Sequence, residues 1–332
     1  MPGPAPAVAA VRVAVRRGLE AHDLTGARVL VGCSGGPDSL ALAAAAGFVV
    51  PQRGGSVGAV VVDHGLQAQS AAVARQAAQT CLGLGLTPVE TVAVRVAVRP
   101  GSTGMEDAAR VARYAALVEQ AVRHGAQAVL LGHTLQDQAE QVLLGLARGS
   151  GARSLAGMPA ARRHGPVTVL RPLLKLSRDT TAQACAELGL ATWADPHNDD
   201  GRFTRVRARR LLPRLEADLG PGVVAALARS ADLLRADADA LDEISDTAYR
   251  QLGPTPWTAA QVRGHPRAVR MRLWQRLAVD HEVPPGSLSA AHLASLDALV
   301  CDWHGQGPVH LPGGTRGRRR ADQVWLERSV TS

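Results

Sequence analysis

A glycine-rich turn between an apolar run and a helix constrains the fold of this chain more than any other feature. The hexapeptide Ser34-Gly35-Gly36-Pro37-Asp38-Ser39 follows the apolar residues 29–31 and opens a helix predicted over residues 40–46. Two glycines let the backbone turn tightly. A strand, a tight turn and a helix in this order are typical of a parallel sheet covered by helices. The hexapeptide therefore predicts an α/β fold.

The same alternation of short apolar runs and helical stretches continues to about residue 190. Strands are predicted at residues 29–31, 59–62, 89–94 and 128–131. Thr103 and Glu106 have the spacing of a capping box, so a helix is predicted from Thr103 to Gly125. Beyond Pro221 the apolar spacing predicts one long amphipathic helix and then a helical region. We expect a domain at residues 1–215, a connecting helix at 216–250 and a small domain at 251–332.

Composition excludes several protein classes. Of the 332 residues, 46% are hydrophobic and 20% are charged, which excludes a disordered chain and a polytopic membrane protein. The longest apolar stretch, residues 40–50, is shorter than the roughly 20 residues that cross a bilayer. Arg12, Arg16 and Arg17 interrupt the N-terminal segment, unlike a signal peptide. We expect a cytoplasmic protein without membrane contact.

The four cysteines, Cys33, Cys81, Cys185 and Cys301, are far apart and form no C-x-x-C pair. Buried free thiols are the expected state of these residues.

A net charge of +8 indicates a polyanionic partner. The segment 202–214 carries six arginines and no acid, so the RNA backbone is its expected partner. Phe203 within it would stack on a base or anchor the core. A second basic cluster comprises Arg316, Arg318, Arg319 and Arg320, for which a disordered, solvated tail is an equal alternative.

The hexapeptide also has the chemistry of a phosphate-binding loop. Backbone N–H groups and the hydroxyls of Ser34 and Ser39 suit a phosphate at the start of a helix. Asp38 would repel phosphates unless a divalent cation lay between them, so Mg²⁺ is predicted at Asp38. The alternative is an ordinary glycine turn in which Asp38 and Ser39 cap the helix. Neither a Walker A loop nor a G-x-G-x-x-G motif follows a strand, which disfavours P-loop kinases and nicotinamide dehydrogenases.

Six further segments strengthen the functional interpretation. They are Val61-Val62-Asp63-His64-Gly65-Leu66, residues 109–117, Leu131-Gly132-His133-Thr134-Leu135-Gln136-Asp137-Gln138-Ala139-Glu140, Arg148-Gly149-Ser150-Gly151, Arg171-Pro172-Leu173-Leu174 and Asp195-Pro196-His197-Asn198-Asp199-Asp200. In this order, and with the hexapeptide, they resemble the tRNA(Ile)-lysidine synthetases of the PP-loop ATP pyrophosphatase superfamily. The resemblance is dense from residue 29 to residue 213. It implies a parallel-sheet PP-loop domain and a smaller, mainly helical C-terminal domain that binds tRNA.

The resemblance also implies an activity. ATP, with Mg²⁺, adenylates the C2 oxygen of the wobble cytidine in the CAU anticodon of tRNA(Ile), and pyrophosphate leaves. The ε-amine of free lysine then displaces AMP to give lysidine. A homodimer is compatible with the sequence, which does not fix the oligomeric state.

The resemblance assigns roles to particular positions. The expected ATP-binding residues are Ser34, Gly35, Gly36, Pro37, Asp38, Ser39, Asp63, His64 and His133. The expected catalytic residues are Asp38, Asp137 and Glu140, of which the last two would hold the lysine ammonium. The expected tRNA-binding residues are Arg110, Arg113, Arg202, Arg205, Arg207 and Arg210.

Simpler roles remain for several of these positions. Asp137 and Glu140 are three residues apart at the start of a helix, where acids stabilise the helix dipole without any ligand. His64 and His133 would be neutral imidazoles hydrogen-bonded at strand ends. Arg110 and Arg113 would form a solvated or ion-paired helix face.

Three positions depart from the family pattern, and two other functions stay open. Gln67 stands where Arg or Lys is usual, Gln141 where Thr is frequent, and Val206 where Asn is common. One alternative function is a PP-loop tRNA thiolase, although the four separated cysteines offer neither a pair nor a cluster site. The other is a non-catalytic tRNA-binding protein regulated by ATP.

Overall fold

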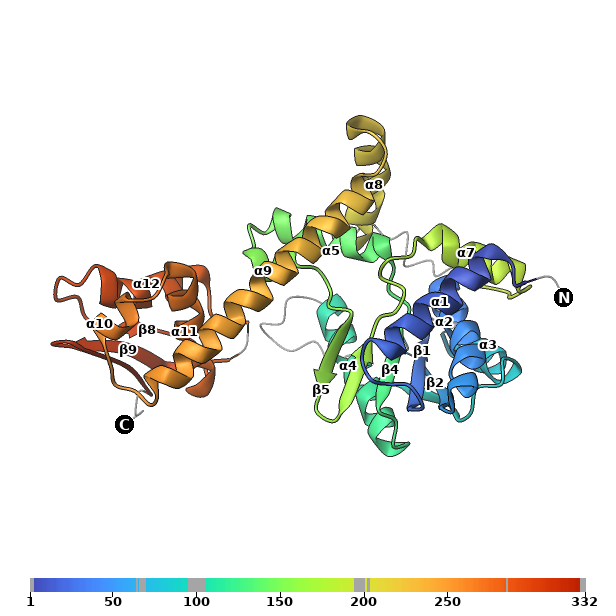
Figure 1. Ribbon diagram of the computed structural model, residues 1–332, viewed down its shortest axis with the longest axis horizontal. Helices are drawn as coiled ribbons and strands as arrows, with labels where there is room; N and C mark the ends of the chain where they lie inside the picture. The colour runs from blue at the N-terminus through green and yellow to red at the C-terminus, as the bar shows by residue number, and fades with distance from the viewer. Residues whose placement is uncertain are drawn as a thin grey trace. The chain divides into compact units, whose positions relative to one another are not determined.

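The computed structural model describes residues 3–63, 65, 70–94, 105–193, 201, 204–284 and 286–328, without the side chains of 105–107. The chain divides into two compact units, residues 1–233 and 234–332 (Figure 1). The boundary falls inside helix α9, Val223–Leu252, which corresponds to the long helix predicted from the sequence. In the described part of the chain, no helix is both long and apolar enough to cross a membrane.

A six-stranded sheet forms the centre of the first unit, in the order β3-β2-β1-β4-β6-β5. The strands are β1 (Arg28–Cys33), β2 (Ser56–Asp63), β3 (Val89–Ala93), β4 (Ala128–Leu131), β5 (Ala161–His164) and β6 (Val167–Leu170). All neighbours are parallel except β5 and β6, which pair antiparallel at one edge. The first four strands confirm the sequence prediction and the α/β fold. The β5–β6 pair was not predicted.

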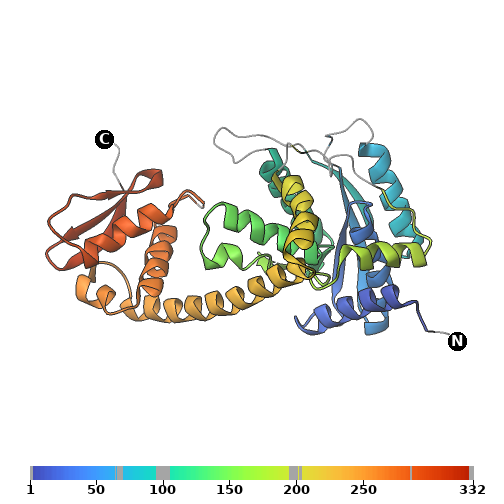
Figure 2. The same ribbon diagram turned by 90° about the horizontal axis from the view of Figure 1, so that it is seen from above.

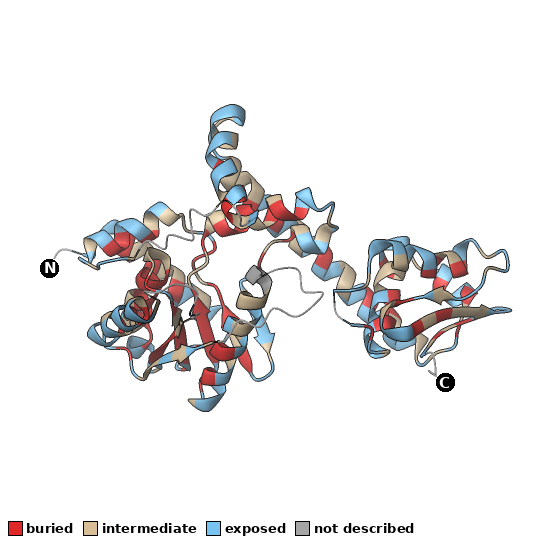
Figure 3. Cartoon of the chain, turned by 180° about the vertical axis from the view of Figure 1, so that it is seen from behind, coloured by how far each residue is buried: buried red, intermediate tan, exposed pale blue. Residues whose placement is uncertain are grey.

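Helices cover both faces of this sheet because its strands alternate apolar residues between the two faces (Figure 2). Val29 and Val31 of β1 pack with α1 (Pro6–Glu20), α2 (Pro37–Val49), α3 (Ser70–Gly83) and α7 (Arg178–Glu187). Leu30 packs on the opposite face with Leu117 of α4 (Met105–Arg123). Figure 3 shows that buried residues concentrate in these strands and the helix faces against them. The predicted Thr103–Glu106 capping box lies outside the described side chains.

Three more helices complete the first unit at the carboxyl edge of the strands. They are α5 (Leu135–Ala147), α6 (Ala152–Leu155) and α8 (Thr204–Leu219). Helix α5 follows β4 after three residues and packs against α6 and α8. The acidic residues of α5 and the basic residues of α8 are therefore brought to the same edge.

The second unit contains a four-stranded antiparallel sheet that was not predicted, together with the expected helices. Its strands are β7 (Trp257–Thr258), β8 (Val309–His310), β9 (Thr315–Arg320) and β10 (Gln323–Arg328), in the order β7-β10-β9-β8. Its remaining helices are α10 (Ala259–Arg263), α11 (Arg267–Asp280) and α12 (Ala290–Cys301). They enclose a core around the fully buried Trp257 and Trp274.

The second basic cluster is therefore a strand, and its interpretation as a disordered tail was wrong. Residues 316–320 lie in β9, which pairs along its whole length with β10. Gly317 faces the core so closely that a Cβ there would lie 2.3 Å from Leu296 Cδ2. The strand pairing and this close packing fix the Gly/Arg-rich segment.

The cysteines largely match expectation. Cys33, Cys81 and Cys185 are buried free thiols, whereas Cys301 is free but exposed at the end of α12.

Candidate active site

A pocket of about 580 Å³ opens where the carboxyl ends of β1, β2 and β4 meet. Open α/β sheets bind their ligands at this edge. Its walls come from the hexapeptide loop and from the starts of α3, α5 and α7, together with α4 and α8. Predicted site residues in the lining are Ser34, Gly36, Pro37, Asp38, Ser39, Asp63, Arg113, His133, Asp137 and Arg205.

The hexapeptide forms a closed turn between β1 and α2. Gly35 has a φ of +82°, which favours glycine, and a Cβ there would lie 3.3 Å from Ala77 Cβ. The Ser39 hydroxyl accepts a hydrogen bond from Ser34 N–H (3.1 Å) and donates one to the Gly36 carbonyl (3.0 Å). Ser39 therefore fixes the shape of the loop, and its proton is not offered to a ligand.

Asp38 lies at the first turn of α2 and is held by α7. Thr181 Oγ1 donates a hydrogen bond to Asp38 Oδ1, and Arg178 Nε lies 3.8 Å from Oδ2. Burial raises the pKa of Asp38 above its usual value and outweighs the hydrogen bond from Thr181; the nearby Asp137 carboxylate raises it further. The absence of a side chain at Gly132 lets the loop approach β4, because a Cβ there would lie 2.7 Å from the Asp38 carbonyl oxygen.

The predicted acidic pair is at the start of α5. Asp137 Oδ2 accepts hydrogen bonds from Thr134 N–H (2.7 Å) and Thr134 Oγ1 (2.9 Å), a capping contact at the first turn, where the sequence had suggested only a dipole role. Burial alone would raise the pKa of Asp137, but Arg178, His133 and Thr134 together hold it below its ordinary value. Glu140, one turn later, is completely buried.

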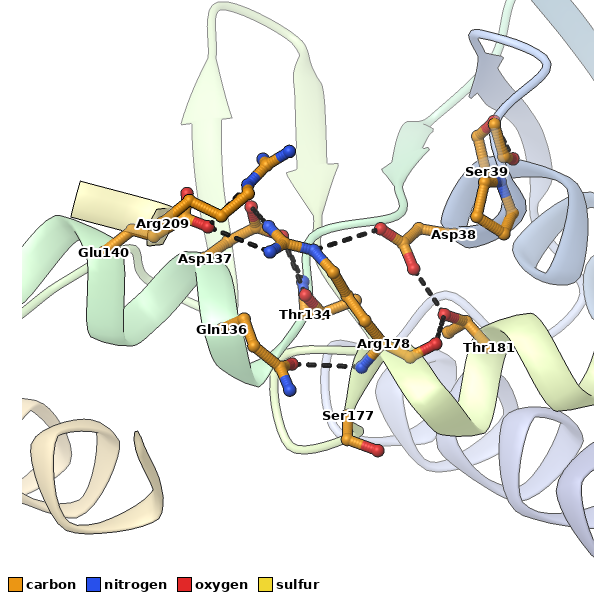
Figure 4. Close-up of polar contacts among 12 residues, drawn as sticks. Asp38, Ser39, Thr134, Gln136, Asp137, Glu140, Ser177, Arg178, Thr181 and Arg209 are labelled. Atoms are coloured by element: carbon orange, nitrogen blue, oxygen red, sulfur yellow. Dashed lines mark hydrogen bonds and ion pairs between the residues drawn. The ribbon is translucent and has the colours of Figure 1, made fainter. Parts of the chain in front are cut away.

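Three arginines surround this acidic pair, and Figure 4 labels two of them, Arg178 and Arg209. Arg178 contacts Asp137 Oδ1 at 2.7 Å and Glu140 Oε1 at 2.9 Å. Arg209 Nε donates to Glu140 Oε1 at 3.0 Å, and Arg205 Nε lies 4.0 Å from Oε2. Arg205 and Arg209 of α8 therefore face the pocket, so Arg205, expected to bind tRNA, lies beside the acidic pair.

Arg178 and Arg209 were not singled out as site residues from the sequence. Arg178 is the first residue of α7, directly after its cap Ser177. A cation at a helix N-terminus is disfavoured by the helix dipole by roughly 0.3–1 kcal/mol, and an acidic partner elsewhere in the fold offsets this cost. That unfavourable position was the available signal for Arg178. Trp193, also missed, lines the pocket, and its backbone N–H donates to the Gly35 carbonyl at 3.0 Å.

His133 follows β4 and lines the pocket, with its Nδ1 atom buried and lacking a hydrogen-bond partner among the described residues. Burial lowers the pKa of His133 from 6.5 to about 3 and outweighs the Asp137 carboxylate. The imidazole is therefore neutral at pH 7, as considered from the sequence. Asp63 ends β2 and accepts a hydrogen bond from Gly65 N–H at 2.9 Å. His64 lies outside the described residues.

The low pKa of His133 predicts a pH dependence of stability. Between pH 6.5 and about pH 3 the unfolded chain binds a proton at this position that the folded chain does not. Lowering the pH from 7 to 5 should therefore reduce the free energy of unfolding, by roughly 2 kcal/mol through His133. Urea denaturation at both pH values should show a smaller loss in His133→Asn. The exposed His22→Asn is the control, and an unchanged loss in His133→Asn would contradict the assignment.

The other arginines expected to bind tRNA lie outside the centre of the pocket, except Arg113. Arg110 lies over the ring of Tyr114, 5.6 Å from its centroid. Arg207 is exposed and donates to the Gly201 carbonyl (3.0 Å) and Thr204 Oγ1 (3.1 Å), and Arg210 is exposed on the same helix. Arg202 and Phe203 lie outside the described residues.

The sheet order and the loop define a PP-loop domain protein, and residues 12–215 match the family model for the PP-loop domain. The tRNA(Ile)-lysidine synthase of Thermobifida fusca is 54% identical over 98% of this chain and 98% of that protein. The synthase of Salinispora arenicola is 50% identical over 96% of each chain. This chain belongs to the tRNA(Ile)-lysidine synthase family, which confirms the resemblance seen in the sequence.

A solved structure also shares the fold. The U34-tRNA thiolase NcsA from Methanococcus maripaludis aligns with a TM-score of 0.57 and 21% identity, over 69% of this chain and 80% of that chain. At this identity the similarity supports the PP-loop fold.

Proposed function

We propose that this protein uses ATP to join free lysine to C2 of the wobble cytidine in the CAU anticodon of tRNA(Ile). The observation that carries the proposal is one pocket that is lined by both Asp38 of the PP-loop and Asp137 of the acidic pair. Glu140 lies buried behind this lining and is joined to Asp137 through Arg178 (Figure 4). This pocket belongs to a chain 54% identical to a tRNA(Ile)-lysidine synthase over nearly its full length. The products would be lysidine in the tRNA, AMP and pyrophosphate.

The first step is adenylation. The cytidine C2 oxygen attacks the α-phosphorus of ATP, a new P–O bond forms, and the bond from the α-phosphorus to pyrophosphate breaks. The N–H groups of the PP-loop and the N-terminus of α2 stabilise the pyrophosphate as its charge develops. Neutral His133 offers its unpartnered Nδ1 to the nucleotide or the base without adding charge.

The second step is displacement of AMP. The lysine ε-amine attacks C2, a C–N bond forms, and the bond between C2 and the AMP oxygen breaks. Only about a few in ten thousand ε-amines are neutral at pH 7, so the ammonium must give up a proton. Asp137 and Glu140 bind the ammonium, and a carboxylate of the pocket accepts that proton.

Asp38 fits a Mg²⁺ ion that arrives with ATP. Mg²⁺ is commonly bound by one or two carboxylates together with substrate phosphates, and Asp38 is a carboxylate in the pocket lining beside the loop. When bound there, Mg²⁺ would neutralise phosphate charge during the departure of pyrophosphate. Its approach competes with Arg178 and Thr181, which hold Asp38 in this structure.

The direct test is a reaction with defined products. The protein is incubated with ATP and Mg²⁺, lysine and a tRNA(Ile) transcript that carries a CAU anticodon. Mass analysis should show the tRNA gaining lysine with the loss of one water, together with AMP and pyrophosphate in equal amounts. Release of ADP, or sulfur transfer to the tRNA, would contradict the proposal.

The exposed face of α8 is the surface we assign to the tRNA backbone. Arg207→Ala and Arg210→Ala should weaken tRNA binding and reduce the slope of log affinity against log salt by about 0.7 to 0.9 for each phosphate that the variant no longer neutralises. Filter binding at several salt concentrations measures this slope. Arg123→Ala, an exposed arginine at the end of α4, is the control. Unchanged slopes for Arg207→Ala and Arg210→Ala would remove them from the RNA surface.

A further inference from the structure

One guanidinium in the pocket contacts carboxylates from two different helices (Figure 4). Arg178 bonds Asp137 Oδ1 at 2.7 Å and Glu140 Oε1 at 2.9 Å, both on α5. Its Nε lies 3.8 Å from Asp38 Oδ2 on α2. Arg178 therefore stands between the carboxylate beside the phosphate loop and the acidic pair assigned to the lysine ammonium.

Arg178 occupies the positions that an incoming ammonium would need. Both oxygens of Asp137 already accept hydrogen bonds, Oδ1 from Arg178 and Oδ2 from Thr134. Glu140 Oε1 is shared by Arg178 and Arg209. Glu140 Oε2 is buried and has no hydrogen-bond partner among the described residues. It also lies 4.0 Å from Arg205 Nε, so both carboxylates of the acidic pair are already matched by cations while Arg178 stays in place.

The Arg178 side chain is partly exposed to the pocket, and bound phosphates would attract it. About a quarter of it, 24%, is exposed, and it lines the same pocket as the PP-loop. Arginine binds phosphate oxygens through bidentate hydrogen bonds. Hydrogen bonds between charged groups are roughly twice as strong as those between neutral groups. A nucleotide held by the loop places phosphates on the Asp38 side of Arg178, opposite the acidic pair.

We propose that Arg178 makes lysine binding depend on bound nucleotide. Without nucleotide, its guanidinium occupies the acidic pair and competes with the lysine ammonium. With nucleotide, the phosphates draw the guanidinium towards the loop, and Asp137 and Glu140 become available to lysine. Arg178 is thus a positioning residue that orders substrate addition. This inference rests on the proposed function, because it takes lysine as the ligand of the acidic pair.

The consequence is a coupling between two ligands at adjacent sites. The same factor that nucleotide adds to lysine affinity must be added by lysine to nucleotide affinity. Coupling of this kind is typically about 5- to 150-fold, so an increase of roughly tenfold or more is expected here.

Equilibrium dialysis of the full-length protein with radiolabelled lysine tests the proposal. The nucleotide is the non-cleavable analogue AMP-CPP with Mg²⁺, so that no reaction intervenes. The intact protein should bind lysine at least about tenfold more tightly with the analogue than without it. Arg178→Met keeps a flexible side chain but removes the charge. It should bind lysine without the analogue about as tightly as the intact protein does with it, and the analogue should then have little effect.

The controls separate this role from structural support. Arg123→Met changes an exposed arginine, with 61% of its side chain accessible, and should leave the coupling intact. Arg178→Lys keeps the charge but cannot form bidentate hydrogen bonds, so the analogue should raise lysine affinity less than it does in the intact protein. Thermal melting of each variant verifies folding, and Arg178→Lys carries the test if Arg178→Met is unfolded.

Three results would overturn the inference. If Arg178→Met weakens lysine binding with and without the analogue, Arg178 supports the acidic pair and does not compete for it. If the analogue leaves lysine affinity of the intact protein unchanged, no coupling exists. If the intact protein binds no lysine even with analogue and tRNA together, the proposed function itself fails, and that failure is distinct from the other two.

Discussion

Asp38→Asn should lower lysidine formation by about 100- to 1,000-fold while leaving tRNA affinity nearly unchanged. The asparagine keeps an oxygen that accepts the hydrogen bond from Thr181, so the contact between α2 and α7 survives. It removes the charge that would balance a metal ion beside the ATP phosphates. Product is measured by mass analysis of the tRNA, and tRNA affinity by filter binding.

Asp179→Asn is the matched control for Asp38→Asn. Asp179 is exposed in the first turn of α7, next to Arg178 in the chain but outside the pocket lining. This variant should retain nearly full activity. An equal loss of product and of tRNA affinity in Asp38→Asn would mean that Asp38 supports the fold or the RNA surface, and would argue against its catalytic assignment.

Glu140→Gln should cause the largest loss of stability among single changes at the candidate site. Glu140 is completely buried and compensates Arg178, Arg205 and Arg209. Removing one partner of a buried ion pair leaves the other charges uncompensated, which typically costs about 3–5 kcal/mol of unfolding free energy. Urea denaturation should show this decrease, and lysine-dependent product should fall with it even under conditions where the variant is folded.

Glu119→Gln provides the comparison. Glu119 forms an ion pair with Arg123 on the surface of α4, with 67% of its side chain exposed. Such a pair contributes roughly 0–1 kcal/mol, so the variant should unfold almost like the intact protein. Equal stabilities of Glu140→Gln and Glu119→Gln would show that the three arginines do not depend on Glu140.

Local sequence patterns were sufficient to predict β1–β4 and the loop between β1 and α2. Strands β1, β2 and β4 are largely buried apolar runs, and burial on both faces of a parallel sheet requires that composition. Strand β3 lies at the sheet edge and is only partly buried, but its valines still gave a strand signal. Strand β5 lies at the sheet edge and contains Arg162 and Arg163, so its pairing with β6 leaves little apolar signal. Strand β9 could not be recognised from the sequence for the same reason, because its arginines leave little apolar signal.

The candidate site was only partly predictable because much of it depends on tertiary contacts. Asp38, Asp137 and Glu140 lie in motifs, but the arginines that pair with them come from α7 and α8, distant in the chain. Gln141, a departure from the family pattern, accepts a hydrogen bond from Arg205 Nη2 at 3.1 Å. Val206, another departure, is buried. Gln141 and Val206 therefore each make contacts within the fold, which residue spacing in the sequence could not indicate.

Because Gly132 has no side chain, it sets the distance between the PP-loop and the start of α5. Gly132 touches the Asp38 backbone on one side and leads within two residues to Thr134, the cap of the helix that bears Asp137. Even one added methyl group would push against main-chain atoms of Asp38 and Ser39 and not against a yielding side chain. The separation between the PP-loop and the start of α5 is therefore set by main-chain packing at Gly132, and a larger side chain there would force β4 and α2 apart.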